Sequence, residues 1–78
     1  MQTSLPLVII DNGKFNGKNI ALSGLEKTFF ENLIKEQGIK TESRVLVLTA
    51  DGEGKIYLQE KGKKFKTFHT KYPDGKTW

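Results

Sequence analysis

The sequence predicts a small two-layer α+β domain in the order ββαββ, with one helix packed on one face of an antiparallel or mixed sheet. Residues 25–34 repeat apolar side chains at helical spacing. The runs at residues 7–10 and 45–50 are continuously apolar, as in buried strands. Turn residues and a return segment follow each run, which is typical of a hairpin.

The first hairpin is expected within residues 5–20. Pro6 lies near the start of its first strand, where a missing backbone N–H is tolerated. Residues 11–13, Asp-Asn-Gly, favour the positive φ angles of a tight turn. The return begins at residues 14–15, and we expect residues 19–20 to continue it as a brief second strand.

A single helix is expected at about residues 24–37. Ser23 and Glu26 have the spacing of a capping box, with Ser23 as the N-cap. Gly38 is the expected left-handed residue that ends the helix. The apolar stripe that would face the sheet consists of Leu25, Phe29, Phe30, Leu33 and Ile34.

The second half of the chain repeats the hairpin pattern. Residues 45–50 form an apolar strand, residues 51–54 turn the chain, and residues 55–59 return with strand alternation. Residues 65–68, Phe-Lys-Thr-Phe, are the candidate for one further strand.

The charge is distributed unevenly along the chain. Residues 1–60 carry seven Lys or Arg against eight Asp or Glu, a balance of −1, whereas residues 61–78 carry six Lys against one Asp, a balance of +5. We therefore divide the chain into a single α+β domain at residues 1–62 and a basic, aromatic edge strand or tail at residues 63–78. A nucleic-acid partner for the whole domain is not favoured, because its body is nearly neutral.

The composition excludes several classes of protein. The 78 residues contain no cysteine, so disulfides and thiolate metal sites are ruled out. No apolar run approaches the length of about 18 residues that a membrane span needs. The N-terminus lacks the pattern of a signal peptide. The chain as given is expected to be a soluble domain.

The two apolar strands carry apolar side chains on both faces, yet a single helix covers only one face of a sheet. The uncovered face would be an apolar patch of a kind that monomers avoid, so we expect it to contact a second copy or a neighbouring domain. The candidate contact residues are Leu7, Ile9, Val45 and Val47, or their alternates Val8, Ile10, Leu46 and Leu48. The pattern does not decide which face the helix covers.

The basic tail combines lysines with aromatic side chains. It is compatible with a solvated edge strand protected by lysines, with contact to an anionic membrane surface, or with binding of single-stranded nucleic acid. The residues that would make such contacts are Lys61, Lys63, Lys64, Phe65, Lys66 and Phe68.

The remaining motifs do not predict catalysis. Residues 11–14 are explained by turn geometry, and residues 51–54 lack the ligand spacing of a calcium loop. His69 is the only histidine, and residues 75–77, Gly-Lys-Thr, lack the glycine and the helix that a P-loop requires. We therefore expect no catalytic residue, metal site or cofactor, and a protein that is not an enzyme.

Residues 6–20 resemble the opening P-x-x-x-I-x-x-G-K-x-x-x-x-N-L of YetF-like proteins, the bacterial domain-of-unknown-function family 421. The likeness continues through residues 33–39, 45–46 and 51–57. Ile20 stands where that family usually has Leu, and the chain after Lys61 has no counterpart.

The resemblance implies the second of two small α+β units in the cytoplasmic region of a membrane protein. Its expected place is then the cytoplasmic side of the cell membrane, and a sibling unit is a natural partner for the uncovered sheet face. The expected function is that of an assembly module. The alternative is a small basic nucleic-acid-binding domain that acts through the tail.

Overall fold

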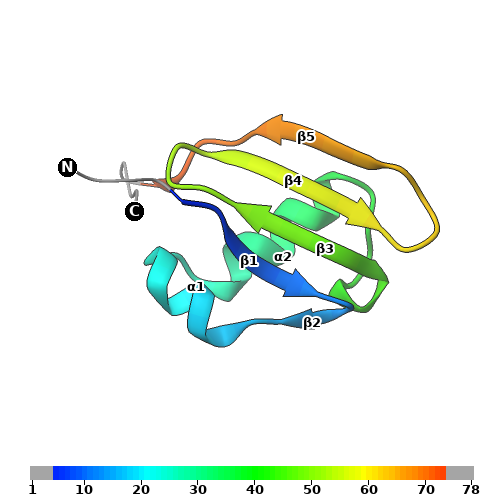
Figure 1. Cartoon of the computed structure of the whole chain (residues 1–78), viewed down its shortest axis with the longest axis horizontal. Coiled ribbons are helices and arrows are strands. Elements are labelled where there is room, and N and C mark those ends of the chain that lie inside the picture. The colour runs from blue at the N-terminus through cyan, green and yellow to red at the C-terminus, as the bar shows by residue number, and fades with distance from the viewer. Residues whose placement is uncertain (1–4, 74–78) are drawn as a thin grey trace.

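The structure is a computed structural model that describes residues 5–73. It contains a five-stranded antiparallel sheet in the order β2-β1-β3-β4-β5. The elements are β1 (Leu7–Asp11), β2 (Lys14–Phe15), α1 (Gly17–Ser23), α2 (Lys27–Glu36), the 3-10 helix η1 (Glu42–Arg44), β3 (Val45–Ala50), β4 (Lys55–Glu60) and β5 (Phe65–His69). In Figure 1 the sheet faces the viewer and α2 crosses behind it. The predicted α+β class is confirmed, but the order ββαββ is incomplete, since α1 and β5 are additional elements.

Helix α1 replaces the second strand that was predicted at residues 19–20. Asn16 is its N-cap, because the Asn16 Oδ1 accepts a hydrogen bond of 3.0 Å from the Asn19 backbone N–H. The Asn19 side chain then donates to the Val8 carbonyl oxygen at 2.8 Å and holds α1 beside β1. The pattern at residues 19–20 is compatible with a strand, but the N-cap formed by the Asn16 side chain favours a helix there.

Ser23 ends α1 and does not cap α2, so the predicted capping box is wrong. The Ser23 Oγ donates to the Ile20 carbonyl oxygen at 2.6 Å and accepts from the Leu25 N–H at 3.1 Å. Gly24 closes α1 with a φ of 75°. The N-cap of α2 is Glu26, whose side chain makes no capping hydrogen bond.

The end of α2 agrees with the prediction, but the helix begins at Lys27 and not at about residue 24, so the buried Leu25 lies before it. The N–H of Gly38, whose φ is 85°, donates to the Lys35 carbonyl oxygen, and the Ile39 N–H donates to that of Ile34. These two bonds form a Schellman motif. Phe30 is completely buried between α2 and the sheet, and Leu33 and Ile34 are buried beside it.

Two β-bulges interrupt the alternation of side chains in the central strands. The register shifts between Val8 and Ile10 in β1, and between Val45 and Val47 in β3. Ile9 and Ile10 are consequently both fully buried, although they are consecutive residues. A bulge moves the residues on either side of it out of strict period-two alternation, so the buried face cannot be counted off along the strand.

The chain beyond Gly62 belongs to the same fold up to Pro73. Strand β5 pairs with β4 over five residues, and Phe68 packs against the core. Tyr72 is buried, and its hydroxyl donates to the Asp51 carbonyl oxygen at 2.6 Å. The rest of the predicted tail, residues 74–78 with Gly75 to Thr77 and Trp78, lies outside the described residues.

Candidate functional site

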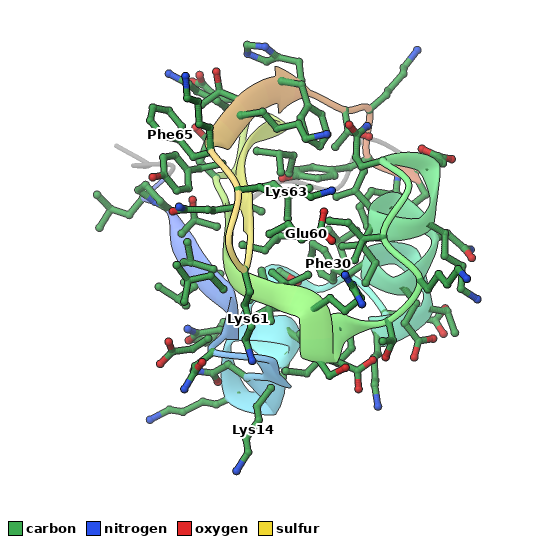
Figure 2. All side chains as sticks on the ribbon, turned by 90° about the vertical axis from the view of Figure 1, so that its right-hand side faces the viewer. Lys14, Phe30, Glu60, Lys61, Lys63 and Phe65 are labelled. Atoms are coloured by element: carbon green, nitrogen blue, oxygen red, sulfur yellow. The ribbon has the colours of Figure 1, made fainter. Side chains whose placement is uncertain are left out.

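The side of the sheet away from α2 is the larger candidate surface, and we call it the open face. The strand register places two cross-strand rows on it: Asp11, Val47, Gln59 and Phe65 in one row, and Val8, Thr49, Tyr57 and Thr67 in the other. Val8 is 37% exposed and Phe65 is 56% exposed. Figure 2 shows Phe65 on the opposite side of the sheet from the buried Phe30.

An aromatic pair occupies the β4–β5 half of the open face. The rings of Tyr57 and Phe65 stack with their centroids 4.8 Å apart and their planes 15° apart. A hollow of about 550 Å³ adjoins Tyr57 and is lined by Pro6, Thr49, Asp51, Lys55, Tyr57 and Thr67. Rings presented in this way offer a large rigid contact area at little cost in side-chain entropy.

The hollow does not bring reactive groups together. The Asp51 Oδ1 already accepts backbone N–H bonds from Glu53 and Lys55, both at 2.9 Å, so this carboxylate closes the β3–β4 turn. Across residues 5–73, no group of three His, Cys, Asp or Glu side chains is placed to hold a metal ion.

The structure divides the predicted contact residues between core and surface. Ile9 and Val45 are fully buried, which corrects their assignment as contact residues, and Leu7 packs against the core. Val47 alone of the first set lies on the open face, where it is half-buried. The cause is the pair of bulges described above.

The alternate set is divided in the same way. Ile10 and Leu48 are buried, whereas Val8 and Leu46 are exposed. Tyr57 is a further open-face residue that neither set included. Its alternation with the buried Ile56 was the signal that could have found it.

The basic and aromatic residues of the tail do not gather on one surface either. Phe65 lies on the open face, whereas Phe68 packs on the core from the side of α2. The Lys66 Nζ reaches the Gln37 Oε1 at 3.3 Å, also on the α2 side. The exposed Lys61, Lys63 and Lys64 lie in the β4–β5 turn.

The β4–β5 turn belongs to a second candidate surface, which we call the basic end. It is formed by residues 11–14, 38–44 and 60–64, which meet at the right-hand end of Figure 1. These segments carry six Lys or Arg and three Asp or Glu, a balance of +3 within the total of +4. Figure 2 looks onto this end and shows Lys63 beside Glu60, with Lys61 and Lys14 toward the β2 edge. The lysines at the start of the predicted tail therefore lie at the same end as Lys40 and Arg44, which come about twenty residues earlier.

Comparison with known proteins adds no family assignment, since no protein-family model and no curated protein matches this sequence. The likeness to YetF-like proteins therefore rests on the residues quoted for it above. Neither α1 nor α2, the α-helices of the described region, is long and apolar enough to cross a membrane.

Proposed function

We propose that this domain is a non-enzymatic assembly module that packs through its open face against a second copy of itself. The observation that carries the proposal is the apolar and aromatic surface on the side of the sheet that α2 does not cover. Exposed apolar patches of this kind mark interaction sites on soluble domains. In a YetF-like membrane protein, the sibling unit would take the place of the second copy.

The arrangement of the open face supports a second copy as the partner. In the proposed dimer the two open faces meet, and the two-fold axis runs between them, parallel to the central strand β3. This axis would place β3 on β3, β1 on β4, and β2 on β5 of the second copy. Val47 would then meet Val47, and Val8 would meet the ring of Tyr57. Lys14 would lie over Phe65, a favourable pairing of a cation with an aromatic face.

The size of the face sets the expected strength of the contact. Five strands spaced by about 4.8 Å, whose lengths range from two residues in β2 to six in β3 and β4 and average about five, give a projected area on the order of 400 Å². A standard interface buries about 800 Å² on each partner, so we expect a reversible, concentration-dependent dimer.

The mass of the protein in solution tests this proposal. Sedimentation equilibrium should show a dimer forming as the concentration rises toward about 1 mM. Val8→Lys and Phe65→Lys should each abolish it, because they place a charge on the open face. Leu22→Lys is the matched control, since Leu22 is 60% exposed on α1. A wild-type protein that stays monomeric over this range would contradict the proposal.

The second candidate function is binding of single-stranded nucleic acid. The stacked Tyr57 and Phe65 favour it, because Lys55 and His69 share their face and cations beside exposed rings suit bases and phosphates. Salt-dependent binding of an oligonucleotide that is weakened by Lys55→Gln, on the open face, would support it. Failure to bind at low salt would exclude it.

A further inference from the structure

A small cleft at the basic end collects charged side chains from two distant parts of the chain. Its hollow of about 270 Å³ is lined by Gly38, Lys40, Arg44, Glu60 and Lys63, which we call the basic cleft. One wall follows α2, and the other is the β4–β5 turn. The open face lies on the other side of the sheet, so the two surfaces can act independently.

Backbone hydrogen bonds hold the walls of the basic cleft together. The Lys61 N–H donates to the Arg44 carbonyl oxygen at 2.9 Å and ties the turn to η1. Within the turn, the Lys63 N–H donates to the Glu60 carbonyl oxygen at 3.0 Å, and the Gln59 Nε2 donates to that of Lys63 at 3.0 Å. The positions from which the cationic side chains start are therefore fixed before any ligand binds.

The charges of the basic cleft are unbalanced. Glu60, whose side chain is 15% exposed, lies 3.3 Å from the Arg44 Nε and 3.5 Å from the Lys63 Nζ. Lys40 lines the same hollow, so the residues of the basic cleft comprise three cations and one carboxylate, a formal charge of +2. Neutralising Glu60 needs only one cation, and the repulsion among the surplus cations costs free energy unless an anion joins them.

The exposure of the cations suits a ligand that arrives from solvent. The Arg44 and Lys63 side chains are 62% and 67% exposed, although both contact Glu60. The ion pair engages Arg44 through Nε, which orients the planar guanidinium and leaves its terminal N–H groups for a second acceptor. The remaining N–H groups of a guanidinium held in this orientation match the spacing of phosphate oxygens.

We propose that the basic cleft binds the phosphate group of an anionic ligand. Arg44 supplies the directed hydrogen bonds, Lys40 and Lys63 supply the charge, and Glu60 holds Arg44 and Lys63 in place. A phosphate dianion would balance the +2 charge of the cleft. The hollow is several times the share of volume of one water molecule, about 30 Å³, so it admits a phosphate with some of its hydration.

Titration of the ¹⁵N-labelled full chain with inorganic phosphate at low ionic strength tests the proposal. Amide shifts should change at Gly38, Arg44 and Lys63 and saturate. Arg44→Gln and Lys63→Gln should each weaken binding by about tenfold. Lys18→Gln, on α1, is the matched control and should bind as the wild type does. Unchanged binding by Arg44→Gln, or shifts that avoid the cleft, would overturn the site.

Vesicles distinguish the source of the phosphate. Co-sedimentation with phosphatidylcholine vesicles that contain phosphatidic acid, lost in Arg44→Gln, would assign a lipid headgroup. Phosphate binding without vesicle binding would assign a free phosphate compound. Arg44→Gln should leave the dimer of the open face intact, so the two proposals can fail separately.

Discussion

At the scale of single residues, the turn after β3 depends on a glycine for two separate reasons. Gly54 has a φ of 89°, which side chains of L-residues rarely adopt. It also lies against the segment after β5, because its carbonyl oxygen accepts the Thr70 N–H at 2.8 Å. A Cβ built on Gly54 would collide with the Thr70 carbonyl oxygen.

Replacing Gly54 by alanine should therefore cost more than backbone strain alone. Gly62 is the matched control, since its φ is 78° but a Cβ there would meet open space. We expect Gly62→Ala to lower the free energy of unfolding by about 1 kcal/mol and Gly54→Ala by about 2–4 kcal/mol. Urea denaturation measures both. Equal losses would show that the β5 segment does not close on this turn.

Tyr72 packs the last described residues of the chain against the hydrophobic core. Its ring meets that of Phe29 edge-on at 5.7 Å. Burial, and to a smaller extent the negative charge of Asp51, raise the pKa of the Tyr72 phenol well above its ordinary value. The neutral phenol is thus the form that the folded state retains.

This raised pKa predicts a loss of stability at alkaline pH. The unfolded phenol ionises above a pH of about 10 while the folded one stays neutral, so stability present below that pH is lost as the pH rises. At about pH 8, Tyr72→Phe should lower the free energy of unfolding by about 1 kcal/mol, because the Asp51 carbonyl oxygen loses the hydroxyl donor and keeps only the weaker bond from the Gly54 N–H. The gap between the two proteins should narrow above a pH of about 10. Urea denaturation measures the free energy of unfolding of both proteins at each pH. A difference that stays constant above a pH of about 10 would contradict this role of Tyr72.

At the scale of elements, the sequence identified those whose signals are local and repeated. The stripe from Leu25 to Ile34 predicted α2, and Gly38 predicted its end, because both signals depend on helix geometry alone. Helix α1 was missed, since a seven-residue segment has too few turns to show a periodicity. Its one clear signal was Asn16 placed three residues before Asn19, which is the spacing of an N-cap.

The bulges are the other limit on prediction at this scale. An apolar run such as residues 7–10 shows that a strand is buried, but it does not show where an extra residue enters the ladder. That position depends on pairing with β3, a strand almost forty residues later. The prediction therefore identified that α2 covers only one face of the sheet, yet it assigned the buried Ile9 and Val45 to the other face.

At the scale of the whole molecule, the fold redistributes charge as well as apolar surface. The sequence places a balance of +5 in residues 61–78, but antiparallel pairing brings the start of that segment to the same end as Lys40 and Arg44. No linear pattern connects these residues, which lie about twenty positions apart. The basic cleft and the open face thus become two separate surfaces, one basic and one that carries exposed apolar and aromatic side chains, as an assembly module with an anionic ligand would need.

The proposed two-fold axis along β3 makes a last prediction that depends on the whole arrangement. The chain has no cysteine, so each single Cys variant carries one thiol. Val47→Cys should cross-link to itself with a short bismaleimide, because β3 would lie on β3 of the second copy. Phe65→Cys should cross-link little alone but readily when mixed with Lys14→Cys, since β5 would face β2.

Mass analysis of the cross-linked products gives the readout, and Leu22→Cys, on α1, is the control for random collision. Strong self-cross-linking of both Phe65→Cys and Val47→Cys would instead place the axis across the strands along the row that these two residues share, because β5 would then lie on β5 and β3 on β3. That outcome would preserve the open face as the interface but reject this register. Cross-linking no stronger than that of Leu22→Cys at every position would reject the interface itself. The experiment therefore separates the existence of the contact from its geometry.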